Sequence, residues 1–264
     1  MDLQISGKRA LVSGSTKGIG FAIACELARE GAKVTINGRQ QDQVAAAVTR
    51  LRGLVAGADV EGVAADLATT AGIEQLIKVR PQVDILVNNL GIFDPVPFAD
   101  IPDSEWQRFF ETNVMSGVRL SRHYLPAMKA ANWGRIVFIS SESGINTPSE
   151  MVHYGMTKSA QLAVSRGLAQ SCAGTGVTVN AVLPGPTKSE GVAEFFGKLA
   201  AEAGIPNEEM ERRFFAEGRP TSILKRMIDP AEVASLVAYV CSARAAATTG
   251  AALRVEGGIV STIC

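Results

Sequence analysis

Short runs rich in β-branched residues alternate with longer segments of helical spacing along almost the whole chain. Seven of these runs are candidate strands, at residues 10–12, 33–36, 60–64, 84–87, 135–139, 177–182 and 252–255. Candidate helices lie between them, at 19–29, 43–52, 104–130, 152–172 and 231–241. Such alternation is typical of parallel strands joined by helical crossovers, and strands that are apolar throughout are usually covered by helices on both faces. The sequence therefore predicts an α/β fold with a doubly wound, seven-stranded parallel sheet.

One stretch interrupts this alternation. Residues 186–224 contain proline, glycine, paired phenylalanines and charged residues without a clear strand. Because a single α/β domain often uses about 250 residues, we interpret residues 1–264 as one domain and 186–224 as an insertion that covers the substrate. Its phenylalanines have two interpretations that stay open, core packing or an apolar wall of the substrate site. They are Phe195, Phe196, Phe214 and Phe215.

Charge and composition exclude several classes of protein. The chain has 26 Lys and Arg against 26 Asp and Glu, so it lacks the basic excess that binds nucleic acid or an anionic membrane surface. No apolar run approaches the roughly 20 residues that span a bilayer, and the N-terminal residues do not resemble a secretory signal. The four cysteines form no C-x-x-C pair, which argues against a metal site. We expect a cytoplasmic protein that binds neither nucleic acid, membrane nor metal.

A glycine-rich segment follows the first predicted strand and precedes the first predicted helix. It has the spacing G-x-x-x-G-x-G. Glycines allow a tight turn there and let backbone N–H groups approach a pyrophosphate at the N-terminus of the helix. An ordinary strand-to-helix turn is the alternative. We predict that this loop binds a dinucleotide through Gly14, Ser15, Thr16, Lys17, Gly18, Ile19 and Gly20.

The end of the second predicted strand indicates which dinucleotide binds. A carboxylate that holds the ribose hydroxyls is expected there, but the sequence has Gly38, followed by Arg39. A carboxylate would repel a 2′-phosphate, whereas Arg39 and Lys17 would attract one. NADP is therefore favoured, and NAD stays possible. The alternative is that both cations are solvated surface groups.

Tyr154 and Lys158 are four residues apart and share one face of a predicted helix. A neighbouring ammonium stabilises tyrosinate, so we expect Lys158 to lower the Tyr154 pKa toward a value useful for proton exchange. Ser141 follows the fifth predicted strand and offers a hydroxyl to a substrate carbonyl. Glu142 either faces the substrate or is a solvated or salt-bridged acid, and His153 is expected to be structural.

Together these motifs resemble the short-chain dehydrogenases/reductases. The resemblance covers nearly the whole chain and implies a Rossmann-like fold with helices on both faces of the sheet. Further matching positions follow the third, fourth and sixth predicted strands and lie in the long helix: Asp66, Asn88-Asn89-Leu90-Gly91, Pro184-Gly185 and Asn113.

The resemblance also implies roles for individual residues. Ser141 would polarise the carbonyl, Tyr154 would transfer the proton, Lys158 would bind the nicotinamide ribose, and Asn113 would hold a proton-relay water. Asp66 and Leu67 would contact the adenine, and Asn88 and Gly91 would line the cofactor cleft. The segment that closes over the nicotinamide would contain Pro184, Gly185, Thr187 and Ser189, with Ser189 preferred to Thr187 as the hydroxyl for the nicotinamide amide.

The function implied is hydride transfer between NADP(H) and a carbonyl or secondary alcohol substrate, with the tyrosine as general acid and base. A 3-oxoacyl-thioester reductase of the fatty-acid type is an alternative within the same family. A non-catalytic dinucleotide-binding regulator is the alternative from another class. The resemblance implies a homotetramer, with a homodimer as the second possibility.

Overall fold

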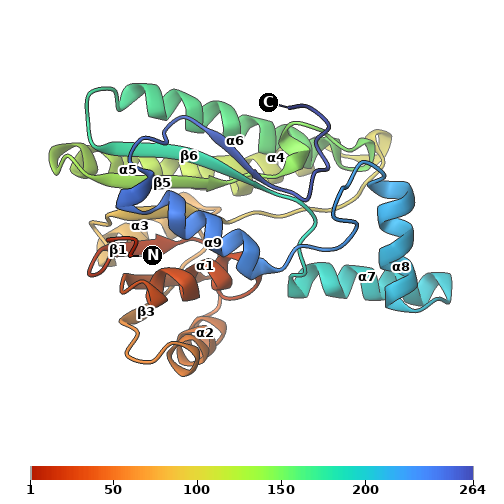
Figure 1. Cartoon of the computed structure of the whole chain (residues 1–264), viewed down its shortest axis with the longest axis horizontal. Helices are drawn as coiled ribbons and strands as arrows, with labels where there is room; N and C mark the ends of the chain where they lie inside the picture. The colour runs from red at the N-terminus through yellow and green to blue at the C-terminus, as the bar shows by residue number, and fades with distance from the viewer. Residues whose placement is uncertain (1, 264) are drawn as a thin grey trace.

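A single parallel sheet organises the chain (Figure 1). The computed structural model describes residues 2–263, apart from the side chains of 194 and 195. Its seven strands follow the order β3-β2-β1-β4-β5-β6-β7, and every neighbouring pair is parallel. They are β1 (Arg9–Val12), β2 (Lys33–Gly38), β3 (Val60–Ala64), β4 (Ile85–Asn88), β5 (Gly134–Ile139), β6 (Val177–Pro184) and β7 (Ala252–Val255). The predicted fold is confirmed, with strand bounds that differ from the predicted ones by at most two residues.

Helices cover both faces of the sheet because alternate side chains of each strand point to opposite sides. One apolar core joins the sheet to α1 (Gly18–Arg29), α2 (Gln41–Leu54) and α9 (Pro230–Val240). A second core joins the other face to α3 (Thr70–Val79), α5 (Ser116–Ala130) and α6 (Val152–Ser171). The strand order changes direction between β1 and β4, and ligands of such sheets bind at the carboxyl ends of the strands beside this point.

Two helical predictions need correction. The helix expected at 104–130 is instead α4 (Asp103–Phe110), one π-helical turn, η2 (Glu111–Met115), and α5. The π turn interrupts the regular hydrogen-bonding pattern at Asn113, which leaves its backbone carbonyl to a side-chain donor described below. Helix α3 was not among the predicted helices. Its N-cap is Thr69, whose hydroxyl accepts the Gly72 N–H at 3.0 Å.

The insertion at 186–224 forms helices, with a small apolar core of its own. Helix α7 (Glu190–Ala203), helix α8 (Asn207–Arg213) and a π turn, η5 (Phe214–Gly218), extend beyond the sheet after the end of β6 (Figure 1). Phe196 and Phe215 are buried with Met227, and Phe214 packs against them. Phe196 and Phe215 thus pack in a core, as one of the two interpretations expects, whereas a role of these residues in a substrate wall stays a prediction. The side chain of Phe195 lies outside the described residues.

Three cysteines, Cys25, Cys172 and Cys241, are buried free thiols, whereas Cys264 lies outside the described residues. Over residues 2–263, no cluster of three or more His, Cys, Asp or Glu side chains is arranged to hold a metal ion. No helix in this range is long and apolar enough to cross a membrane.

Candidate active site

The segments that follow β1, β2 and β4 are tied together at the carboxyl edge of the sheet. Asn89, after β4, donates its backbone N–H to Ser13 Oγ at 2.9 Å and its side-chain amide to the Gly14 carbonyl at 2.9 Å. Asn37, on β2, accepts the Gly14 N–H through Oδ1 at 3.1 Å. Sequence reasoning assigned no role to Asn37 or to the Asn89 side chain, although asparagines at two strand ends were a visible signal.

The glycine loop at 14–20 is compact for steric reasons. Gly14 and Gly18 both have φ near +59°, a conformation that favours glycine. A Cβ on Gly20 would lie 2.5 Å from Asn89 Nδ2 and 2.6 Å from the Gly14 carbonyl oxygen. Ser15 is fully buried, where its hydroxyl donates to the Val12 carbonyl at 2.6 Å and accepts the Asn37 N–H at 3.0 Å. Its side chain therefore shapes the loop from within.

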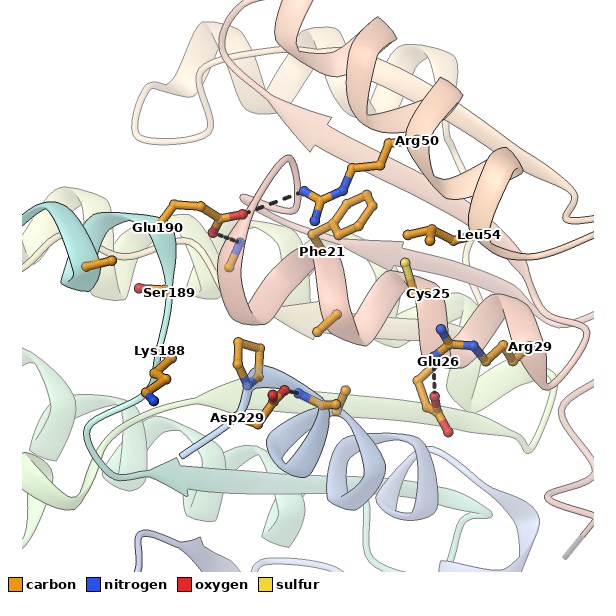
Figure 2. Close-up of a pocket in the computed structure, with 16 residues that line it drawn as sticks. Phe21, Cys25, Glu26, Arg29, Arg50, Leu54, Lys188, Ser189, Glu190 and Asp229 are labelled. Carbon is orange, nitrogen blue, oxygen red and sulfur yellow. Dashed lines mark hydrogen bonds and ion pairs between the residues drawn. The ribbon is translucent and has the colours of Figure 1, made fainter. Parts of the chain in front are cut away.

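An anion already occupies the N-terminus of α1. Lys17 is the N-cap residue, but its side chain makes no capping bond. The Gly18 N–H instead donates to Glu190 Oε2 at 2.8 Å, and Arg50 Nη1 lies 3.6 Å from Glu190 Oε1 (Figure 2). The carboxylate oxygen stands where a phosphate oxygen of a dinucleotide would accept the same N–H. The loop therefore fits a dinucleotide in backbone conformation and in charge preference.

A groove of about 470 Å³ runs along the outer side of α1 (Figure 2). Side chains of α1, α2 and α7 line it, including Phe21, Arg50 and Glu190, and Ser189 lies at the end nearest the glycine loop. Cations and carboxylates alternate along its wall, with ion pairs between Arg50 and Glu190 and between Arg29 and Glu26. Neither Tyr154 nor Lys158 is among the residues that line this groove.

Two cations adjoin, in sequence, the residues that meet at the end of β2. Lys17 and Arg39 are both exposed, and neither forms an ion pair with any residue in 2–263. A Cβ on Gly38 would lie 2.5 Å from Thr16 Cγ2, so the loop leaves no space for a side chain at this strand end. Glycine is therefore required at this strand end for steric reasons. Because no acid can stand there, no negative charge is present that would repel a 2′-phosphate.

The residues expected beside the adenine and in the cofactor cleft lie at adjoining strand ends. Asp66 follows β3, and its Oδ1 accepts the Ala68 N–H at 3.1 Å. The Leu67 side chain is buried in the apolar core that includes α3. Asn88 is buried and donates to Ser121 Oγ at 3.2 Å, whereas its Oδ1 has no hydrogen-bond partner among the described residues. A Cβ on Gly91 would lie 3.5 Å from Lys158 Nζ.

Lys158 is a buried ammonium, with 4% of its surface exposed. Its Nζ donates to the Ile139 carbonyl at 2.9 Å and to Gln161 Oε1 at 3.3 Å. It lies 5.4 Å from the centre of the Tyr154 ring. Burial lowers the pKa of Lys158 to about 8, and the charge of Glu142 opposes this change.

The Tyr154 phenol differs from expectation. Burial raises its pKa above the ordinary value, the charge of Glu142 raises it further, and hydrogen bonding with the Ser141 side chain partly counteracts both. The expected lowering by Lys158 is therefore wrong for this arrangement. At neutral pH the phenol keeps its proton. The Phe93 ring meets the Tyr154 ring edge to face, with centroids 6.5 Å apart.

Asn113 holds two segments together. Its Oδ1 accepts the Ile92 N–H at 2.8 Å, and its Nδ2 donates to the Ile92 carbonyl and to Thr157 Oγ1, both at 3.0 Å. Its backbone carbonyl in the π turn accepts Gln161 Nε2 at 2.6 Å. Both polar atoms of the Asn113 side chain thus have hydrogen-bond partners within the protein.

Gln161 links Lys158 to Asn113 and was missed by sequence reasoning. It is 1% exposed, with Oε1 toward the Lys158 ammonium and Nε2 toward the Asn113 carbonyl. The opposite orientation would place donor against donor and acceptor against acceptor, so the chemistry of the partners fixes it. A polar residue one turn after Lys158 in the predicted helix was the available signal.

The two candidate hydroxyls after β6, those of Thr187 and Ser189, lie in different surroundings. Thr187 is buried, and its hydroxyl donates to the Gly185 carbonyl at 2.8 Å. Ser189 is the N-cap of α7, where its hydroxyl accepts the Val192 N–H at 3.3 Å. The Ser189 Cβ would be 3.2 Å from a Cβ built on Gly18, so Ser189 lies against the glycine loop.

His153 and Glu142 are both buried. The His153 ring packs on Phe109 and Trp106, with centroids 4.0 and 6.0 Å away, and neither ring nitrogen has a hydrogen-bond partner within residues 2–263. Glu142 accepts a hydrogen bond from the Ser141 hydroxyl and lies 3.7 Å from Arg219 Nε. A solvated Glu142 is therefore the wrong interpretation.

Comparisons with known proteins agree with this geometry. The family model described as short chain dehydrogenase matches residues 8–199. Two uncharacterized oxidoreductases of Bacillus subtilis, YvaG and YvrD, are 49% and 45% identical, over 100% of both chains in each case. The D-beta-hydroxybutyrate dehydrogenase of Cupriavidus necator is 32% identical, over 97% of this chain and 99% of its own. The crystal structure of L-sorbose reductase from Gluconobacter frateurii, complexed with NADPH and L-sorbose, has a TM-score of 0.94 at 32% identity and 100% coverage of both chains.

Proposed function

The chain belongs to the short-chain dehydrogenase family, and from that premise we propose that it transfers a hydride between NADP(H) and a carbonyl or secondary alcohol substrate. When bound, the nicotinamide ring supplies or accepts the hydride. The observation that carries the proposal is the grouping of Ser141, Tyr154 and Lys158 at the sheet edge that the glycine loop also borders. A protein that only binds a dinucleotide has no need of a proton donor in that place.

Each catalytic side chain has a separate task in this proposal. Tyr154 donates a proton to the carbonyl oxygen as the hydride arrives, and its raised pKa keeps the proton in place at neutral pH. Ser141 orients the same oxygen through its hydroxyl. Lys158, held by Ile139 and Gln161, binds the ribose of the cofactor. A protonated Tyr154 can act as the acid when a carbonyl is reduced to an alcohol.

NADP is the cofactor that the charges favour. Lys17 and Arg39 are exposed cations without an ion-pair partner in the described part of the chain, and the strand end that Arg39 follows carries no acid. The L-sorbose reductase that this chain resembles was crystallised with NADPH. The backbone of residues 14–20 would hold the pyrophosphate. Because Ser189 lies against Gly18 in this loop, we assign Ser189 to the pyrophosphate and no longer to the nicotinamide amide.

Arg39→Asp is expected to reverse the cofactor preference. The substitution replaces a cation that would pair with the 2′-phosphate by an anion that repels it, so kcat/KM for NADPH should fall by about 10- to 100-fold. The value for NADH should change little or rise. Steady-state kinetics with both cofactors measure this, with the exposed Arg122→Asp on α5 as the matched control. Equal losses for NADPH and NADH would contradict the assignment of Arg39.

The pH dependence should follow Lys158. Below about pH 8 its ammonium is charged, and the charge is lost as the pH rises through that value. Because kcat/KM reports the pKa values of the free enzyme, carbonyl reduction should decline above about pH 8. Among the charged groups around Lys158, Glu142 favours the ammonium. The Tyr154 phenol ionises at higher pH because its pKa is raised.

Two substitutions of Gln161 sharpen this pH test. Gln161→Leu removes an acceptor from the ammonium, so the alkaline decline should move to lower pH, whereas Gln161→Glu should move it to higher pH. A purely structural role would lower activity at every pH alike. Unmoved profiles in both variants, with unchanged thermal unfolding, would contradict the role given to Gln161.

The proposal includes a homotetramer. Strand β7 lies at the edge of the sheet, where its outer side has no partner strand among the described residues, and α5 and α6 cover one face of the sheet beside β5 and β6. An open sheet edge and long, neighbouring helices are surfaces that a second copy of the chain can cover.

A screen of ketones tests the proposed function. We expect ketone-dependent oxidation of NADPH, faster than that of NADH, and an acetoacetyl thioester in the panel separates the fatty-acid type of reductase from one that acts on small ketones. Tight NADPH binding without turnover of any carbonyl compound would favour the regulator instead.

A further inference from the structure

Glu142 is a buried carboxylate directly beside the carbonyl-polarising serine. It begins a short 3-10 helix, η3 (Glu142–Gly144), after β5, and only 5% of its surface is exposed. Its Oε2 accepts a hydrogen bond from the Ser141 hydroxyl. A buried charge is costly unless it is paired and hydrogen-bonded, so the position calls for a further partner.

That partner comes from the insertion. Arg219, 9% exposed, lies with its Nε 3.7 Å from Glu142 Oε1 and its Nη1 3.1 Å from Glu150 Oε1. Its guanidinium also stands 5.4 Å from the centre of the Phe214 ring. Arg219 thus forms ion pairs with both Glu142 and Glu150 and lies closer to Glu150. No described residue donates a hydrogen bond to Glu142 Oε1, because 3.7 Å is an ion-pair distance and not a hydrogen-bond distance.

The Ser141 hydroxyl has one proton for two acceptors. In the structure this proton points to Glu142, whereas the proposed reaction needs it on the substrate carbonyl. A plain ketone would have to break the Ser141–Glu142 bond and leave the carboxylate without a replacement donor. A substrate that carries a hydroxyl next to its carbonyl supplies that donor itself.

We propose that Glu142 accepts a hydrogen bond from a hydroxyl on the carbon next to the reacting carbonyl, which makes α-hydroxy ketones the preferred substrates. This inference rests on the proposed function. The substrate hydroxyl replaces Ser141 on the carboxylate, Ser141 turns to the carbonyl oxygen, and Arg219 stays paired with Glu142. Bound NADPH would supply the hydride for the new C–H bond. Tyr154 gives its proton to the carbonyl oxygen and is left as tyrosinate, which takes a proton from solvent after each turnover, so the products are a vicinal diol and NADP⁺.

The test compares hydroxyacetone with 2-butanone, in which a methyl group replaces the hydroxyl. A hydrogen bond to a charged acceptor predicts that kcat/KM for hydroxyacetone exceeds that for 2-butanone by about 10- to 100-fold. In Glu142→Gln, which keeps the size of the side chain but removes its charge, this ratio should fall by about tenfold or more. Glu150→Gln is the matched control. It removes the outer charge near Arg219 and should change both rates by the same factor.

The results distinguish the preference for α-hydroxy ketones from the proposed reduction of carbonyl compounds on which it rests. If the protein reduces 2-butanone as efficiently as hydroxyacetone, or if Glu142→Gln lowers both rates equally, the inference is overturned and the proposed function stands. If no ketone is reduced although NADPH binds, both are overturned. Thermal unfolding of each variant shows whether a lost rate reflects a lost fold.

Discussion

Tyr154→Phe is expected to lower kcat/KM for carbonyl reduction by about 100- to 10,000-fold, the usual contribution of a positioned acid. The substitution removes only the phenol oxygen, so the ring contact with Phe93 is retained. The affinity for NADPH should change little, because the lost group gives its proton to the substrate. Stopped-flow or steady-state kinetics measure the rate, and quenching of protein fluorescence measures the affinity.

Tyr239→Phe provides the matched control for this loss. Tyr239 lies on α9 and is 41% exposed, so its phenol oxygen has no part in the proposed reaction, and the variant should keep full activity. A Tyr154→Phe protein as active as the parent would remove the tyrosine from the mechanism.

Lys158→Met is expected to affect both cofactor binding and turnover. Methionine fills most of the same space but cannot donate to the ribose or to the Ile139 carbonyl. We expect KM for NADPH to rise and kcat to fall, with kcat/KM lower by about 100-fold or more. Removing this buried cation also takes a donor away from the Ile139 carbonyl and from Gln161 Oε1, so thermal unfolding must be measured alongside the kinetics.

Lys78→Met on α3 controls for the loss of a lysine, since Lys78 is exposed. The combination of a raised KM and a lowered kcat separates a group that binds cofactor from one that only supports the fold. A Lys158→Met protein with native thermal stability and an unchanged KM for NADPH would contradict the assigned role.

The sheet could be predicted from the sequence because its strands are buried on both faces and read as short apolar runs. Helix α3 could not, since Gly72 lies within it and reads as a helix breaker. The structure explains the glycine, because a Cβ there would lie 2.0 Å from the Asp66 carbonyl oxygen. The reason is a tertiary contact with the preceding loop, which no local pattern reports.

The candidate site was predictable where a motif fixes residue types at strand ends. Its electrostatics were not, because the Tyr154 pKa depends on burial and on the Glu142 charge, which the sequence alone does not locate. The links that Gln161 and Glu190 make were missed for a similar reason. Glu190 reaches Gly18 across 172 positions of sequence, and Gln161 reaches Asn113 across 48. Only the fold brings these atoms together.

The fate of the hydride tests the central claim most directly. NADPH carrying deuterium at the transferred position of the nicotinamide is incubated with the best ketone of the screen, and the product alcohol is analysed by mass spectrometry and NMR. We predict one deuterium on the carbinol carbon, formed by the parent protein and nearly abolished in Tyr154→Phe. An alcohol without deuterium at that carbon, or NADPH consumed without any alcohol, would contradict hydride transfer to a carbonyl.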